Sequence, residues 1–147
     1  MRTPSRIVLL VASTFPATIA IAACTSGNKQ EAAQVVEAMD RFRKADNAAK
    51  PATVETLRAV KCSAADVCKA RDACLASAEA TSKALRLKAE VEQGLGAVEK
   101  GTLAKDSPEA RALGTKLDEA ESLLKEGFAA LPACDDQVMD LKRKYQI

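Results

Sequence analysis

Histidine is missing from this 147-residue sequence, and tryptophan is missing as well. The missing histidine removes the commonest general base, the imidazole ligands of metal sites, and any Ser-His-Asp or Cys-His arrangement for nucleophilic catalysis. We therefore expect no catalytic, cofactor-binding or metal-binding residues. An enzyme that uses carboxylate or lysine chemistry stays open as an alternative.

Aromatic residues are scarce, and few runs of β-branched residues exist to pack a sheet. The chain has one tyrosine and three phenylalanines, and no segment alternates between apolar and polar residues as a half-buried strand requires. Alanine, leucine, glutamate, lysine and arginine dominate instead, which is typical of long helices. The composition predicts an all-α fold in one small domain.

The chain also lacks an excess of either charge once residues 1–23 are set aside. It has 22 Lys and Arg against 20 Asp and Glu, and Arg2 and Arg6 account for the difference. A clustered basic surface, which nucleic acid would require, is therefore not expected.

The N-terminal segment combines two arginines with a long apolar run. Arg2 and Arg6 precede residues 7–23, which are all apolar or small, as in the charged and apolar regions of an export signal. The run ends in Ile21-Ala22-Ala23-Cys24, which resembles the lipobox of bacterial lipoproteins. The resemblance implies a signal peptide at residues 1–23, cleavage before Cys24, and a fatty-acylated Cys24 that anchors the mature protein in a membrane.

Two other outcomes fit the same segment. An uncleaved anchor would keep residues 7–23 in the membrane, although Pro16 interrupts the run. Ordinary cleavage after Ala20-Ile21-Ala22 would match an A-x-A site. Within the lipoprotein resemblance, Thr25 occupies the position where Asp would signal inner-membrane retention in some bacteria. The resemblance therefore favours an outer membrane, with the protein on its periplasmic side, if the cell has one.

Start signals divide the mature chain into helices. Residues 24–28 are predicted to be the lipidated cysteine with a short polar tether, and residues 29–147 a helical domain. The predicted starts are the capping boxes Asn28-x-x-Glu31 and Ser63-x-x-Asp66 and the N-cap pair Ser107-Pro108, with a short helix restarting at Pro51.

Apolar residues recur every three or four positions after each start, as on one face of a helix. The predicted buried faces are Ala32, Val35, Met39 and Phe42; then Val54, Leu57 and Val60; then Ala73, Ala76, Ala80, Ala84, Leu87, Val91, Leu95 and Val98; then Ala110, Leu113, Leu117, Ala120, Leu124 and Phe128; and finally Cys134, Val138, Leu141 and Tyr145.

These segments predict a three- to four-helix bundle. A loop at residues 101–106 should join helices over 63–100 and 107–146 into a long antiparallel hairpin, with one or two N-terminal helices packed on it. Pro132 should kink or end the second helix of the hairpin.

The cysteine count supports both the lipid anchor and disulfide bracing. Five cysteines leave one over in an exported protein, and assigning Cys24 to the lipid leaves an even number. Cys74 and Cys134 lie about 30 residues on either side of the hairpin turn, so they should meet across it. Cys62 and Cys68 form the remaining pair, provided that no unbroken helix spans residues 53–90.

A zinc site made by these four thiolates is the alternative, and no redox Cys-x-x-Cys motif is present. Structural zinc sites usually have two to four residues between paired cysteines. Five residues separate Cys62 from Cys68, and five separate Cys68 from Cys74. The spacing therefore favours disulfides over zinc.

Three further groups have both a structural and a functional interpretation. Asp135-Asp136 follows Pro132 and is predicted to cap a helix rather than to act as a carboxylate pair. Lys142-Arg143-Lys144 is predicted to be a solvated last turn, with contact to an acidic partner or lipid headgroups as the alternative. The aromatic residues Phe42, Phe128 and Tyr145 are expected in the core.

The sequence thus predicts a non-catalytic, lipid-anchored envelope protein that binds another envelope component or spaces it from the membrane. A small-ligand carrier with an interhelical cavity is an alternative, which the alanine-rich seam disfavours. A filled core with one exposed apolar patch would favour a partner-binding surface.

Overall fold

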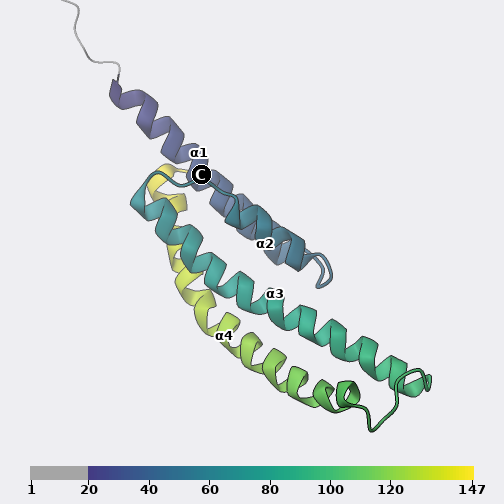
Figure 1. The fold of residues 1–147 in the computed structure, drawn as a ribbon. Coiled ribbons are helices and arrows are strands. Elements are labelled where there is room, and N and C mark those ends of the chain that lie inside the picture. The colour runs from purple at the N-terminus through teal and green to yellow at the C-terminus, as the bar shows by residue number, and fades with distance from the viewer. Residues whose placement is uncertain (1–19) are drawn as a thin grey trace, which may run out of the picture.

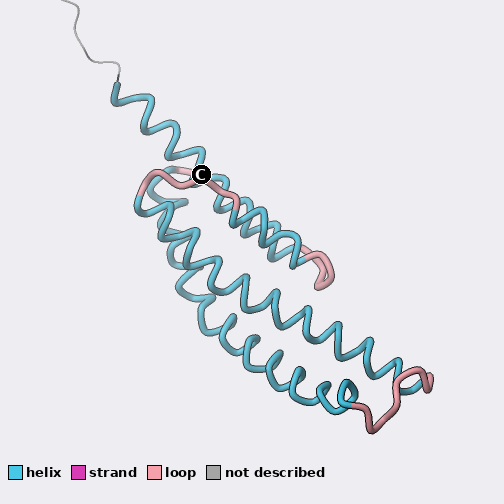
Figure 2. Tube along the Cα trace, in the orientation of Figure 1, coloured by secondary structure: helices cyan, strands magenta, loops and turns pink. Residues whose placement is uncertain are grey.

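The computed structural model describes the backbone of residues 20–147 and the side chains of residues 26–147. It contains the helices α1 (Ala20–Lys44), α2 (Lys50–Arg58), α3 (Ala65–Glu99) and α4 (Pro108–Tyr145). Figure 2 shows that only loops connect these helices, and no strand occurs within residues 20–147. The predicted all-α, disulfide-braced helical bundle is confirmed.

Helices α3 and α4 form the predicted long antiparallel hairpin, and α1 and α2 form a shorter pair packed on one half of it (Figure 1). The hairpin projects well beyond the loop that joins α1 to α2. The first turns of α1 project at the other end, close to the C-terminus, where Lys29 Nζ donates a hydrogen bond to the carbonyl oxygen of Gln146 at 3.4 Å. The molecule therefore has one end that holds the N-terminal part of α1 and the C-terminus, and an opposite end formed by the hairpin turn.

The core lies where all four helices meet. The predicted faces of α1 and α2 are buried there, and so is the face at the end of α4, except that Tyr145 is partly exposed. The buried residues of these faces are Ala32, Val35, Met39, Phe42, Val54, Leu57, Val60, Cys134, Val138 and Leu141. Lys50 holds the sharp turn after α1, because its Nζ donates to the carbonyl oxygens of Phe42 at 2.9 Å and Ala45 at 2.7 Å.

The predicted seam of α3 is partly wrong. Ala80, Ala84 and Val91 are buried as expected, but Ala76 is exposed and Leu95 is 50% exposed. The residues of α3 that are buried are Val67, Ala70, Cys74, Ser77, Ala78, Ala80, Ser82, Ala84 and Val91. The first half of α3 contacts α1, α2 and α4 and so buries a broad sector, in which two small serines occupy positions that an apolar search passes over.

The predicted face of α4 is partly wrong over residues 110–128. Ala120 is buried, but Leu117 is 51% exposed and Phe128, which was expected in the core, is 66% exposed. Gly127, which the predicted face omits, is buried against α3. A glycine lets two helix backbones come close together, and this turns the neighbouring Phe128 away from the contact.

Two predicted helix starts are confirmed, and two are wrong. Pro51 lies in the first turn of α2. Ser107 caps α4 and accepts a hydrogen bond from the Ala110 backbone N–H at 3.1 Å. Asn28 lies inside α1, whose helical backbone also includes residues 24–28, the predicted tether. Glu31 instead accepts hydrogen bonds from the Ser63 backbone N–H at 2.6 Å and the Ser63 hydroxyl at 2.8 Å. This tertiary contact takes the groups expected in both capping boxes, and α3 begins after Ala64.

Pro132 does not end α4, which continues through it and curves along its length (Figure 1). No helix therefore begins at Asp135-Asp136, and the predicted capping role is wrong. Asp135 instead forms an ion pair with Arg43 of α1, and Arg43 also lies 3.9 Å from an Asp40 carboxylate oxygen. This contact fastens α1 to the hairpin.

Candidate functional site

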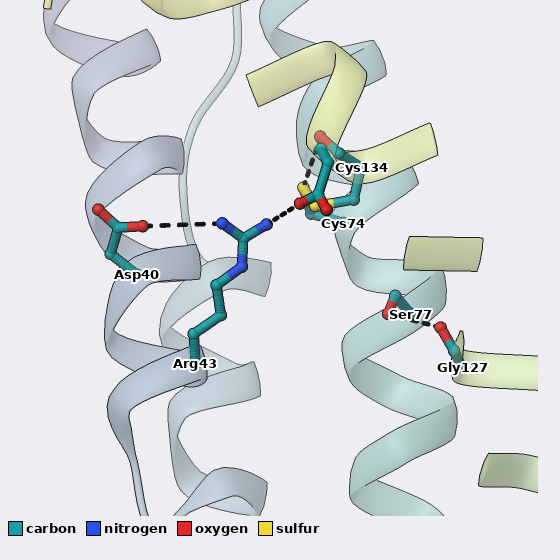
Figure 3. A network of polar contacts seen from close by, with 7 residues as sticks. Asp40, Arg43, Cys74, Ser77, Gly127 and Cys134 are labelled. Carbon is teal, nitrogen blue, oxygen red and sulfur yellow. Dashed lines mark hydrogen bonds and ion pairs between the residues drawn. A yellow bond between two sulfur atoms is a disulfide. The ribbon is translucent and has the colours of Figure 1, made fainter. Parts of the chain in front are cut away.

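The disulfide between Cys74 and Cys134 joins α3 to α4 inside the core. The two Cα atoms are 4.5 Å apart, and both residues are fully buried. Figure 3 shows this bridge beside Arg43 of α1. The contact of Ser77 with Gly127 lies about one helical turn further along α3. The predicted pairing across the hairpin is therefore present.

The second disulfide joins Cys62 to Cys68 with a Cα–Cα distance of 5.1 Å. The chain is not helical between Ala59, which caps α2, and Ala64, which precedes α3, so Cys62 can fold back over the first turn of α3. The condition attached to this prediction, a break in the helix, is met. A four-thiolate zinc site is incompatible with this arrangement, because these sulfur atoms bond to one another.

The proposed lipidation site is placed only in part. Cys24 lies within α1, but the side chains of residues 20–25 are not described, and residues 1–19 of the expected signal peptide lie outside the described residues. Within the part of the chain that is described, no helix is both long enough and apolar enough to span a membrane.

The C-terminal basic cluster takes part in contacts within the bundle. Lys144 Nζ donates to Asp66 Oδ2 at 2.8 Å and the Tyr145 hydroxyl to Asp66 Oδ1 at 3.3 Å, which joins the end of α4 to the first turn of α3. The bond from Lys144 lowers the pKa of Asp66, and the same bond raises the pKa of Lys144. Arg143 lies 3.5 Å from a carboxylate oxygen of Asp140. The predicted solvated turn is thus partly an anchor for the helix end.

A groove of about 550 Å³ lies between α1 and α2. It is open to solvent, and its charged lining includes the ion pair of Glu37 with Arg41. Glu55 also lines it and pairs with Arg58, whose second partner is Glu79 of α3 at 2.6 Å. These charges are balanced locally, so the groove resembles an ordinary helix junction more than a binding site for a charged ligand.

The half of the hairpin beyond α1 and α2 exposes a surface that combines apolar and charged side chains. Two grooves lie there: one of about 340 Å³ beside Lys88, Leu117 and Leu124, and one of about 230 Å³ where Leu85 and Lys88 meet the loop after α1. We call this surface the distal face. It consists of Leu85, Lys88, Ala89, Glu92 and Leu95 on α3 and Leu117, Glu121, Leu124 and Phe128 on α4.

Helical spacing places these residues on one side of each helix. Leu85, Lys88, Glu92 and Leu95 are three or four positions apart, and so are Leu117, Glu121, Leu124 and Phe128. Two helices alone cannot cover both apolar stripes, because each helix shields only one side of the other. Three large side chains therefore remain half or more exposed, Leu95, Leu117 and Phe128.

The distal face continues the surface on which α1 packs. Phe128 is seven residues, about two helical turns, before Asp135, which pairs with Arg43 of α1. Leu131, between them, packs against the core. Beyond Lys44 the chain turns back, and Asn47 and Ala48 border the groove at Leu85. The distal face is thus the part of the hairpin surface that α1 and α2 are too short to cover.

Sequence reasoning did not identify this surface, because it assigned Leu95, Leu117 and Phe128 to the core. A signal was available in the segment lengths. The predicted short helix from Pro51 to Val60 spans about 15 Å, against about 55 Å for the hairpin.

No family model, curated protein or solved structure matches this chain.

Proposed function

We propose that this protein is a lipid-anchored, non-catalytic protein of the bacterial cell envelope that presents the distal face to a partner. The observation that carries the proposal is the cysteine pairing. Two disulfides join Cys62 to Cys68 and Cys74 to Cys134. Of the five cysteines in the chain, Cys24 is the one that remains. Disulfides persist in oxidising compartments outside the cytosol. The lipobox-like sequence before Cys24 assigns this remaining cysteine to a thioether-linked lipid.

The position of Cys24 supports a spacing role. Cys24 lies on α1 at the end of the molecule that also holds the C-terminus, whereas the hairpin turn lies at the opposite end (Figure 1). Helix α3 has 35 residues and so spans about 52 Å at 1.5 Å per residue. A lipid on Cys24 would hold one end at a membrane and leave the distal face tens of ångströms away along the hairpin.

The exposed residues support a binding surface over the carrier alternative. A carrier would hold its ligand in an enclosed apolar cavity, whereas the grooves on the distal face open at the surface and are bordered by charged residues such as Lys88 and Glu121. Half-exposed leucines and a phenylalanine on one side of two helices favour a protein-binding surface. An outer-membrane location rests on Thr25 alone.

The anchor is tested by mass spectrometry of the N-terminal peptide from protein expressed in a bacterial host. We expect a peptide that begins at Cys24 and has the added mass of acyl chains. A mature protein that begins at Ala23 without acyl chains would overturn the proposal, and so would retention of residues 1–23.

A matched pair of variants sharpens the test. The Cys24→Ala variant should lose acyl labelling and should not be processed to the mature size. The Cys62→Ser, Cys68→Ser double variant retains Cys24 and should be labelled and processed normally. Mature-sized Cys24→Ala protein in the membrane fraction would contradict lipid anchoring.

A further inference from the structure

The two disulfides lie in opposite surroundings. Cys74 and Cys134 are both 0% exposed, and their bridge joins two long helices inside the core. Cys62 and Cys68 are both partly exposed, and their bridge joins a loop to the first turn of α3. A reductant reaches the buried bridge only when α3 and α4 separate, whereas the other bridge requires only local motion of the loop.

The loop that contains Cys62 is attached at both ends. Val60 is buried at its start, and the Arg71 guanidinium donates to the Val60 carbonyl oxygen at 3.1 Å. At the other end Ser63, the residue after Cys62, donates from its backbone N–H and its hydroxyl to the Glu31 carboxylate. The disulfide lies between these two attachments and fixes the path of the loop to Ser63.

The contact of Ser63 with Glu31 connects the disulfide to α1. Among the described side chains of α1, the first buried one is Ala32. The turn before it is held by Glu31 and by Lys29, whose Nζ donates to the Gln146 carbonyl oxygen at 3.4 Å. The first turns of α1 therefore depend strongly on the position of Ser63.

The surroundings of Cys68 favour its release from the bridge. Cys68 lies in the first turn of α3, and the N-terminal end of a helix stabilises a thiolate. The acidic residue of the same turn, Asp66, already has its carboxylate bonded to the end of α4. An attacking thiolate that bonds to Cys62 would thus displace the better leaving group.

We propose that the Cys62–Cys68 bridge is a site of reversible thiol–disulfide exchange with a dithiol protein, and that its reduction loosens the attachment of the first turns of α1. The Cys74–Cys134 bridge stays closed throughout. This inference goes beyond the proposed function and depends neither on the lipid at Cys24 nor on the distal face.

The exchange transfers two electrons from the dithiol to the bridge. One thiolate of the dithiol attacks the Cys62 sulfur, forms an S–S bond with it and displaces Cys68 as a thiolate. The second thiolate then attacks the sulfur of the first, which closes the dithiol's own disulfide and displaces Cys62. The dithiol is oxidised, and its two protons end on Cys62 and Cys68.

Graded reduction of the folded full-length protein in mild detergent tests the selectivity. Dithiothreitol is the probe dithiol, iodoacetamide labels each thiol as it appears, and peptide mass spectrometry identifies the labelled residue. We expect Cys62 and Cys68 to be labelled at least about tenfold faster than Cys74 and Cys134, because the buried bridge requires opening of the fold. Equal rates, or earlier labelling of Cys74 and Cys134, would overturn the proposal.

The same reaction in concentrated urea is the control. Both bridges should then be reduced at similar rates, because the unfolded chain protects neither. A difference that persists in urea would show that the fold does not cause the selectivity. When the reductant is removed from the folded protein, the Cys62–Cys68 bridge should form again, and its failure to form would contradict reversible exchange.

Hydrogen exchange tests the effect on α1. The Cys62→Ser, Cys68→Ser double variant lacks the exposed bridge and keeps the buried one. Amides of residues 26–34 and 60–66 should exchange faster than in the unchanged protein, while those of residues 74–84 keep their rates. Unchanged exchange over residues 26–34 would show that the bridge does not hold the first turns of α1.

Glu31→Ala shows whether Ser63 carries the effect. It removes the acceptor of both bonds from Ser63 and leaves the disulfides in place. Alone it should speed exchange over residues 26–34, and adding it to the double variant should produce little further change there, because both act on one contact. Fully additive effects would contradict this connection. Circular dichroism of each variant checks that the helices are intact.

Discussion

Ser77 of α3 donates its hydroxyl hydrogen to the carbonyl oxygen of Gly127 of α4 at 2.8 Å (Figure 3). Both residues are buried. A Cβ atom added to Gly127 would lie 2.5 Å from Thr81 Oγ1 and 3.1 Å from the carbonyl oxygen of Ser77. The two helices pack closely here because one has a glycine and the other a small hydroxyl residue, and the hydrogen bond satisfies the polar group that this contact buries.

Gly127→Ala should destabilise the protein despite the higher helix propensity of alanine. The added methyl group collides with Thr81 and with backbone atoms of α3, and such overpacking costs about 1–3 kcal/mol. Urea denaturation should show a lower midpoint than that of the unchanged protein. Gly114→Ala is the control, because a Cβ atom there meets nothing within 4 Å, and it should stabilise by up to about 1 kcal/mol. The same change in both variants would contradict the close approach.

The two disulfides should differ in their contribution to stability. The Cys74–Cys134 bridge spans a sequence separation of 60 residues and the Cys62–Cys68 bridge one of 6. In the chain-entropy model these loops correspond to about 4 and about 2 kcal/mol. Replacing each pair by alanine and measuring the free energy of unfolding should give the larger loss for the long loop. The opposite order would show that native contacts, rather than the entropy of the unfolded chain, determine how much each disulfide contributes to stability.

The two phenylalanines should respond differently to truncation. Phe42 is 6% exposed and packs in the core, so Phe42→Ala should cost about 3–5 kcal/mol. Phe128 is 66% exposed, so Phe128→Ala should change the stability of the protein by less than about 1 kcal/mol. Thermal unfolding of the two variants measures both effects. A large loss at Phe128 would place it in the core after all.

Stability should depend on pH through the contact of Asp66 with Lys144. The bond from Lys144 lowers the pKa of Asp66 below its ordinary value of 3.8, so the contribution is present above that value and is lost as pH falls through the lowered pKa. The pKa of Lys144 is raised above 10.5, so at the alkaline end the contribution is lost as pH rises through the raised value. The pair is exposed on the Lys144 side, so solvent screens it and its contribution at neutral pH is small.

Asp66→Asn tests this dependence. The variant should be less stable than the unchanged protein at neutral pH and should approach it as the pH falls through the lowered pKa of Asp66, where the carboxylate becomes protonated. Lys144→Met should show most of the same neutral-pH loss, because it removes the same bond. Urea midpoints at several pH values measure both. A stability difference between Asp66→Asn and the unchanged protein that is independent of pH would show that the ion pair does not contribute.

The fold and the cysteine pairs could be predicted because they depend on local signals. Ser107 before Pro108 marks the start of α4, and equal distances from the hairpin turn bring Cys74 and Cys134 together. Apolar spacing also gave the buried sides of α1 and α2 correctly, because these short helices bury one narrow stripe each.

The errors come from contacts between distant parts of the chain. Glu31 bonds to Ser63, 32 residues away, and this contact overrides the capping signals of both residues. Gly127 and Ser77 are not apolar in a hydropathy pattern, yet their small size lets them pack together between α3 and α4. The distal face escaped prediction for the same reason, because the exposure of Phe128 depends on where α1 ends.

The hydrogen bond from Lys29 to Gln146 has a practical consequence for engineering this protein. It keeps the C-terminus beside the N-terminal helix, so a tag or reporter domain fused after Ile147 would crowd the end that the proposed anchor occupies. The loop between Glu99 and Pro108 is an alternative position for a tag, because it lies at the opposite end of the molecule. An epitope inserted there would be displayed to antibodies at the far tip, while both disulfides and the core remain undisturbed.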